Sequence, residues 1–352
     1  MLSRKNFTKE HIEELRNSSG NDPSILERTI YAFGLLESIR KTEMPFIFKG
    51  GTALLLLLDK PMRLSTDIDI IVAPGTDIDS YIEQAGKVFP FVSCEENIRK
   101  GGRNIEKRHY RFLFESPLTG KMIHILLDVL FEDNPYPTIE QREIRNSLLI
   151  TEGDPLTVDT PSINCILGDK LTAFAPHTTG IPFGIDKELE IIKQMYDCYT
   201  LLQTMTDYNE VRRAYLSVVE KEIAYRSLQI KPEDALADTV KSCICLIGRG
   251  SFAKSEYAHY ADGIRRIQGH IFSGSISGET AAVYACPILR FAASMLKNVP
   301  YTEISDTDLY QRDTIMVRNA KRITYLRQVD PKAYAELVET YNLLGNEFFV
   351  LE

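Results

Sequence analysis

Two aspartates, Asp67 and Asp69, stand two residues apart in an apolar stretch, and their carboxylates are the groups best suited to chemistry. In an extended strand, residues two apart point to the same face, so the carboxylates are expected together while Ile68, Ile70 and Val72 point into the opposite layer. Two like charges held this close repel each other unless a cation or a proton lies between them. The pair therefore predicts a site for a divalent cation.

A glycine pair precedes the aspartates. Gly50 and Gly51 follow the short apolar run that begins at Phe46, and an apolar helix is expected after them. Without Cβ atoms, glycines let backbone N–H groups approach a ligand closely, and the start of a helix offers unpaired donors to phosphate. Thr52 can add a hydroxyl. Each motif alone also fits an ordinary turn or surface strand, but together they predict phosphoryl or nucleotidyl transfer.

A third carboxylate, Asp128, lies inside the apolar run IHILLDVLF. A buried charge without a partner would cost several kcal/mol, so a partner for Asp128 is expected. The partner is either a cation of the same site or an ordinary salt bridge.

The glycine pair and the aspartates belong to two longer patterns. GGTAL begins at Gly50, and RxSxDxD is formed by Arg63, Ser65, Asp67 and Asp69. At this spacing they resemble the polymerase-β-like nucleotidyltransferases and, within them, the AbiEii/AbiGii-type toxin family. In that fold a third carboxylate arrives from a neighbouring strand, and Asp128 is expected in that place.

The resemblance implies an α/β (α+β) fold: a polymerase-β-like nucleotidyltransferase domain with a mixed sheet, followed by an α-helical domain. At 352 residues the chain exceeds the size at which one hydrophobic core usually keeps growing, which also favours two domains. We place the nucleotidyltransferase domain at residues 1–158 and the helical domain at residues 159–352.

Two further motifs fall in the helical domain. Lys170 lies in GDKLTA and Asp197 in KQMYDCYTL, which resemble a second signature of the family. By this resemblance the helical domain contributes both residues to the cleft, where Lys170 touches the nucleotide phosphates and Asp197 orients Lys170 or assists the attacking hydroxyl. The helical pattern itself, which starts near Thr160, places Asp169 and Lys170 at the rim of the helix. The loop at 175–186 is either a substrate loop or a simple excursion.

The predicted site residues fall into three sets. The catalytic residues are Asp67, Asp69, Asp128, Lys170 and Asp197; the nucleotide-binding residues are Lys49, Gly50, Gly51, Thr52, Arg63, Ser65 and Lys170; and the metal ligands are Asp67, Asp69 and Asp128. The resemblance implies Mg²⁺ as cofactor, in a two-metal site.

The implied activity is transfer of a nucleoside monophosphate from a nucleoside triphosphate to an acceptor hydroxyl. The family resemblance suggests a toxin of a toxin–antitoxin or phage-defence system, with the 3′ end of tRNA as acceptor and a cognate antitoxin as partner. Two alternatives remain: a nucleotidyltransferase that modifies a small molecule, such as an antibiotic, and a non-catalytic nucleotide- or RNA-binding protein.

Composition sets outer limits. The net charge of −8 argues against a chain that coats nucleic acid over its whole surface. The apolar runs are too short for a membrane span, no apolar signal core begins the chain, and we expect a cytoplasmic protein. The six cysteines are scattered and are expected to be free thiols.

One segment of the acidic chain is densely basic. It would steer an RNA backbone or a polyphosphate to the site, or it is a solvated hairpin tip. Its basic residues are Arg99, Lys100, Arg103, Lys107, Arg108 and Arg111.

Periodicity predicts the remaining elements. They are a helix from Asp22-Pro23 to about Arg40, a helix at 77–89, strands at 108–115 and 121–130, an edge strand around 148–150, and helices at 209–228, 232–247, 254–272, 279–296 and 331–344.

Overall fold

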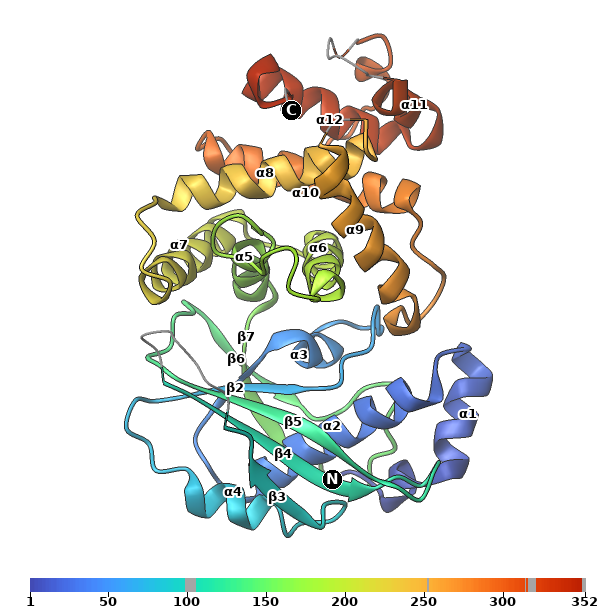
Figure 1. Ribbon diagram of the computed structural model, residues 1–352, viewed down its shortest axis with the longest axis vertical. Helices are drawn as coiled ribbons and strands as arrows, with labels where there is room; N and C mark the ends of the chain where they lie inside the picture. The colour runs from blue at the N-terminus through green and yellow to red at the C-terminus, as the bar shows by residue number, and fades with distance from the viewer. Residues whose placement is uncertain (99–105, 252, 314, 316–320, 350–352) are drawn as a thin grey trace. The chain divides into compact units, whose positions relative to one another are not determined.

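A computed structural model describes residues 1–98, 106–251, 253–313, 315 and 321–349 (Figure 1). The chain forms two compact units. Unit 1 comprises Met1–Ser162 and Gly269–Gly274, and unit 2 comprises Ile163–Gln268 and Ser275–Glu352.

Unit 1 is built on a mixed sheet with seven strands in the described residues, in the order β3-β4-β5-β2-β1-β7-β6. The mixed sheet confirms the predicted α/β class. The strands are β1 (Ile47–Lys49), β2 (Ile68–Val72), β3 (Ser93–Glu96), β4 (Lys107–Glu115), β5 (Met122–Phe131), β6 (Ile139–Glu143) and β7 (Thr157–Pro161). The helices of unit 1 are α1 (Lys9–Ser19), α2 (Pro23–Lys41), α3 (Gly50–Leu57) and α4 (Asp79–Ala85).

Helix α2 confirms the prediction made from its first residues. The Asp22 side chain accepts hydrogen bonds from the N–H groups of Ser24 and Ile25, which satisfies two of the otherwise unpaired donors at the helix start. Further along, Tyr31 stacks on Phe114 of β4 with ring centroids 3.6 Å apart. Helix α2 therefore covers one face of the sheet, behind β4 and β5 in Figure 1.

The strands β4 and β5 have one buried face and one face whose residues are mostly half-buried, called the half-open face below. Their predicted alternation is confirmed: Phe112 and Phe114 are fully buried, whereas their neighbours Arg111 and Leu113 are only half-buried. On β5 the same alternation leaves Asp128 on the half-open face. The apolar face is anchored by α2, and the polar residues of both strands are left accessible.

Unit 2 is helical, as predicted. Its α-helices in the described ranges are α5 (Ile163–Ala173), α6 (Glu188–Leu202), α7 (Tyr208–Tyr225), α8 (Pro232–Gly248), α9 (Lys254–Arg266), α10 (Gly278–Leu296), α11 (Lys321–Val329) and α12 (Pro331–Leu344). The six cysteines are free, as expected. Within the part of the chain that the structure describes, no helix has the length and apolar character needed to span a membrane.

The connector before unit 2 differs from the prediction. No strand forms at 148–150, because backbone groups there bond to the N-terminal segment: Ile150 O accepts from Ser3 N at 2.9 Å, and Leu148 O lies 3.0 Å from His11 Nε2. The added strands are β6 and β7 instead. Since β7 runs to Pro161, the following helix begins at Ile163 rather than near Thr160.

Helix α4 is also shorter than predicted, spanning Asp79–Ala85 instead of 77–89. The chain turns away at Gly86, where an added Cβ would lie 2.7 Å from Cys94 Sγ. After Ala85 the backbone continues in tighter turns: Lys87 N donates to Gln84 O at 3.0 Å and Val88 N to Ala85 O at 3.2 Å.

Candidate active site

The two best-placed carboxylates lie side by side on neighbouring strands. Asp69 of β2 and Asp128 of β5 are Cα partners in a parallel pair, so their side chains share the half-open face of the sheet. Asp67 is exposed and lies directly before β2. Thr52 is buried, and its hydroxyl donates to the Asp67 carbonyl at 2.5 Å, which ties α3 to the start of β2. That hydroxyl proton is therefore already in use.

The expectation that Asp128 is buried is wrong, but Asp128 does have a side-chain partner. Its side chain is 36% exposed, and its Oδ1 lies 2.6 Å from Nδ1 of His109 on β4. The partner was missed because His109 carries no motif. Its place opposite Asp128 follows only from the register of β4 and β5.

The glycine pair packs against the residues of the RxSxDxD pattern. Gly50 has φ of +83°, and an added Cβ would overlap Oδ2 of Asp69. At Gly51 an added Cβ would lie 2.6 Å from Arg63 Nη2 and 2.9 Å from Ser65 Oγ. A Cβ at either position would force these side chains to shift, so the two sequence motifs form one cluster.

Helix α3 begins at this cluster. Its N-cap, Lys49, makes no side-chain capping bond to the first turn. The N–H groups of the first turn thus lack that internal acceptor and suit an anion. The Lys49 ammonium lies 5.8 Å from the centre of the Tyr136 ring. The Arg63 side chain is mostly buried and donates to Leu64 O at 3.2 Å, so it lies beneath the glycine turn rather than in solvent.

The donor set suits Mg²⁺, although it does not form a complete protein cage. Among the described residues, no three His, Cys, Asp or Glu side chains gather closely enough to hold a metal ion. Mg²⁺ prefers oxygen ligands and is commonly held by one or two carboxylates together with substrate phosphates and water. Asp69 and Asp128 on adjacent strands, beside the uncapped start of α3, fit that mode of binding.

Unit 2 holds the other predicted pair. Lys170 of α5 and Asp197 of α6 form an ion pair of 2.9 Å, and Lys170 Nζ also donates to Gln194 Oε1 at 3.0 Å. The side chains are 9% and 1% exposed. The expectation that Lys170 lies at the rim of its helix is therefore wrong: α6 covers that side of α5. Burial, followed by the Asp197 charge, raises the pKa of the neighbouring Cys198.

The loop at 175–186 is held to unit 2 by a buried carboxylate. Oδ2 of Asp238 accepts from His177 N and from Thr178 Oγ1, both at 2.8 Å. Burial raises the pKa of Asp238, and the Thr178 hydroxyl lowers it. The first part of the loop is thus anchored on α8.

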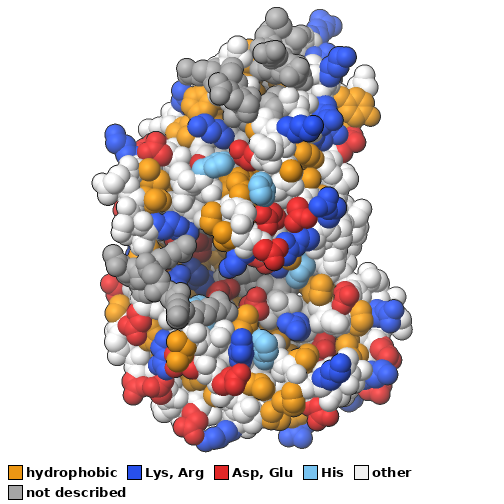
Figure 2. Space-filling model, viewed as in Figure 1, with side chains coloured by type: hydrophobic (Ala, Val, Ile, Leu, Met, Phe, Trp, Pro, Cys, Tyr) orange, Lys and Arg blue, Asp and Glu red, His pale blue; other side chains and the backbone are white. Residues whose placement is uncertain are grey.

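The predicted basic segment is only partly described, since Arg99, Lys100 and Arg103 lie outside the described residues. Arg108 pairs with Asp79 at 2.7 Å and with Glu96 at 2.9 Å, and the Glu96 hydrogen bond is the largest cause of its raised pKa. Arg111 is 3.8 Å from Glu95 and remains 42% exposed. Positive and negative side chains are interspersed over the face shown in Figure 2, in keeping with the modest net charge.

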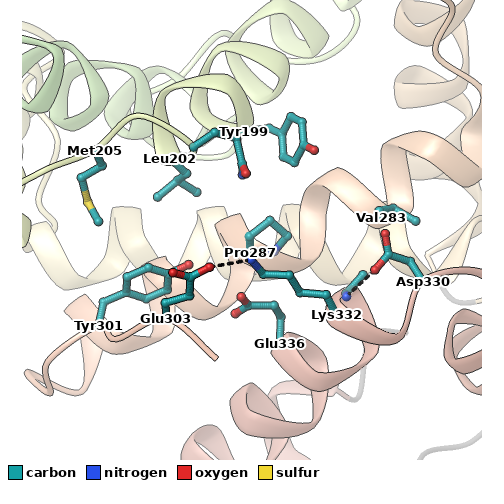
Figure 3. Close-up of a pocket in the computed structure, with 12 residues that line it drawn as sticks. Tyr199, Leu202, Met205, Val283, Pro287, Tyr301, Glu303, Asp330, Lys332 and Glu336 are labelled. Carbon is teal, nitrogen blue, oxygen red and sulfur yellow. Dashed lines mark hydrogen bonds and ion pairs between the residues drawn. The ribbon is translucent and has the colours of Figure 1, made fainter. Parts of the chain in front are cut away.

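A cavity of about 320 Å³ lies in unit 2 (Figure 3). Its walls come from α6, α10, α12 and the segment at Tyr301–Glu303. The charged groups there are committed to each other: Lys332 pairs with Glu303 at 2.9 Å, and Glu336 pairs with Arg290. The cavity contains none of the predicted catalytic residues.

The family described as nucleotidyl transferase AbiEii toxin, type IV toxin–antitoxin system, matches residues 35–263. The chain is similar to the structure of JHP933 from Helicobacter pylori, with 14% identity, 78% of this chain and 94% of that chain covered, and a TM-score of 0.45. An antigenic nucleotidyltransferase-like protein from Paracoccidioides brasiliensis shows 18% identity, 57% and 91% coverage, and a TM-score of 0.36. No curated protein matches the sequence.

Proposed function

Because the chain belongs to the AbiEii nucleotidyltransferase toxin family of type IV toxin–antitoxin systems, we propose that it transfers a nucleoside monophosphate from a nucleoside triphosphate to an acceptor hydroxyl with Mg²⁺. The observation that carries this proposal is the pairing of Asp69 with Asp128 beside the start of α3. Two carboxylates and a phosphate-binding turn then lie within one unit.

In this proposal Asp69 and Asp128 would hold the cation together with phosphate oxygens, where it would neutralise charge on the triphosphate and lower the pKa of the acceptor hydroxyl. Asp67, the third predicted ligand, lies directly before β2 and belongs to no close group of three such side chains in the described residues. The backbone N–H groups of Gly50 and Gly51 bind phosphate oxygens. Lys49, Ser65 and Arg63 complete the nucleotide-binding set, with Arg63 supporting the turn from below.

Unit 2 contributes Lys170 in this proposal. A cation that faces the β- and γ-phosphates would offset charge on the departing pyrophosphate. Asp197 and Gln194 hold the Lys170 ammonium in one place, at 2.9 and 3.0 Å.

Two versions of the function differ in the molecule that accepts the nucleotide. In the first version the acceptor is the 3′ end of tRNA and a cognate antitoxin is the regulator, as the resemblance to the toxin family suggests. A small hydroxylated molecule is favoured by one observation: Arg108 is occupied by Asp79 and Glu96, which weakens the predicted basic track.

The test is transfer of radiolabel from each α-labelled nucleoside triphosphate, with Mg²⁺, to total RNA or to a small-molecule extract. Label in RNA supports the tRNA version, and label in the extract alone supports the small-molecule version. Asp154→Asn, which removes an exposed carboxylate elsewhere in unit 1, is the control for charge change. Absence of label in either fraction, with folded protein and every triphosphate, would reject transferase activity on these acceptors.

The salt dependence of RNA binding gives a second test. Arg111→Ala should reduce the slope of log affinity against log salt by about one unit if Arg111 contacts a phosphate. Arg145→Ala, which removes an exposed arginine that is 3.7 Å from Glu143, is the matched control. Equal slopes for both variants would remove Arg111 from the RNA-binding surface.

A further inference from the structure

Four polar residues stand in one row across the half-open face of the sheet. Lys49 of β1 is the Cα partner of Asp69 in β2, Asp69 is the partner of Asp128 in β5, and Asp128 is the partner of His109 in β4. Residues paired in register point to the same face. The two carboxylates are therefore flanked by Lys49 on one side and by His109 on the other.

His109 makes a short contact with Asp128 in this row. Its Nδ1 lies 2.6 Å from Oδ1 of Asp128, a length typical of a strong hydrogen bond to a charged acceptor. Its side chain is 17% exposed, against 36% for Asp128, so the imidazole is held between strands while the carboxylate reaches further into solvent. Among the described residues, His109 is the side chain that hydrogen-bonds Asp128.

The bond has a directional consequence. With Oδ1 engaged, the side chain of Asp128 cannot rotate freely, and Oδ2 remains as the oxygen open to another ligand. Both the imidazolium and the neutral tautomer protonated at Nδ1 can donate this bond, so the effect does not depend on the charge of His109. Carboxylates that ligate metals are commonly oriented by such hydrogen bonds.

We propose that His109 is a positioning residue that holds Asp128 so that its second oxygen faces the divalent cation. This role rests on the nucleotidyltransferase function proposed above. The alternative is an ordinary cross-strand pair, which contributes only to the stability of the sheet. In that case a substitution of His109 would lower the free energy of unfolding and leave the metal affinity unchanged.

Three variants separate the two roles. His109→Leu removes the donor, and His109→Asn places an amide donor near the same position. His124→Leu is the matched control, because His124 is a half-buried histidine on the same face of β5, with no carboxylate hydrogen bond in the described part of the chain. Each is studied as the full chain, and its unfolding midpoint in urea is measured alongside.

The decisive readout is Mn²⁺ binding, followed by electron paramagnetic resonance, in the presence of a non-hydrolysable nucleoside triphosphate. His109→Leu should weaken Mn²⁺ binding by about 10- to 100-fold, as is usual when a ligand loses its orienting partner. His109→Asn should recover most of that loss, and His124→Leu should bind as the unchanged protein does. The Mg²⁺ concentration for half-maximal transfer should follow the same order.

The outcomes also separate this inference from the function beneath it. If the unchanged protein binds Mn²⁺ and transfers nucleotide, but His109→Leu binds Mn²⁺ equally well and only unfolds at lower urea, the pair is structural and the positioning role is rejected. If the unchanged protein neither binds Mn²⁺ with nucleotide nor transfers label, the metal-dependent function fails and the role of His109 fails with it.

Discussion

The predicted catalytic residues of the two units differ in how far their charged side chains are exposed to solvent. In unit 1, Asp128 is 36% exposed and Asp67 is exposed, so solvent and a bound substrate can reach the carboxylates. In unit 2, Lys170 and Asp197 are 9% and 1% exposed and are joined at 2.9 Å. Unit 1 keeps Asp67 and Asp128 accessible, and unit 2 encloses the Lys170–Asp197 ion pair between two helices.

This difference decides what a substitution can report. Neutralising a half-exposed carboxylate changes the stability of the protein little, so the activity of such a variant reports on the chemistry. Removing one member of a buried ion pair leaves the other charge poorly solvated, so the activity of such a variant also reflects a loss of folding stability. Activity data on Lys170 are therefore interpretable only beside stability data.

The largest expected effect is at the buried pair. Lys170→Met should lower the free energy of unfolding by about 3–5 kcal/mol, because it removes the cation that faces Asp197. Urea unfolding at neutral pH measures this. The double variant Lys170→Met/Asp197→Leu should be more stable than Lys170→Met, since it buries no unmatched carboxylate. A loss below about 1 kcal/mol in Lys170→Met would mean that the pair is solvated and that the contrast between the units is wrong.

The second effect is at the accessible carboxylates. Asp69→Asn should reduce nucleotide transfer by at least about a hundredfold while the free energy of unfolding changes by less than about 1 kcal/mol. Asparagine keeps the shape of the Asp69 side chain, and the substitution removes one of the two like charges on the paired strands β2 and β5. Steady-state transfer rates and urea unfolding are compared with those of Asp154→Asn. Full activity in Asp69→Asn would reject the metal assignment, and unfolding would show that Asp69 is structural.

A third effect tests how the glycine turn supports Asp69. Gly50 and Gly75 have φ of +83° and +78°, so alanine at either should cost about 1–2 kcal/mol of backbone strain. A Cβ at Gly75 meets no atom within 4 Å, whereas a Cβ at Gly50 overlaps Asp69. Gly50→Ala should therefore lose transfer activity that Gly75→Ala keeps, under conditions where both are folded. Equal activities would show that the position of Asp69 is not critical.

The smallest expected effect concerns a buried charge in unit 1. Burial raises the pKa of Glu27, although Ser116 Oγ donates to it at 2.6 Å and lowers the pKa. A raised pKa in the folded state means that the contribution of Glu27 to stability is present at low pH and is lost as the pH rises through that pKa. Glu27→Gln should therefore gain up to about 1 kcal/mol at pH 7 and nothing well below the ordinary value of 4.5. Destabilisation at pH 7 would show that the hydrogen bonds to the carboxylate outweigh its burial.

Local pattern was enough for much of the fold. The start of α2 followed from an aspartate and a proline, β4 from its alternation, and β5 from the turn that precedes it, because capping, strand periodicity and turns depend on residues close in sequence. The strand β7 and the edge strand β6 escaped detection, because TVDTP and IEQRE show no apolar alternation. Their pairing depends on β1, which lies about a hundred residues earlier.

The sequence by itself determined the chemistry that is available: a glycine pair, the RxSxDxD pattern and a lone aspartate in an apolar run, whose spacing is set by local backbone geometry. Only the tertiary structure decided how those groups are held. The register of β4 and β5 places His109 against Asp128 across 19 residues, and the packing of α6 on α5 buries Lys170 against Asp197. The His109–Asp128 contact leaves no local trace in the sequence, because it joins residues that meet only when two strands pair. The Lys170–Asp197 contact was expected from the resemblance of two motifs, but its burial follows only from the packing of two helices.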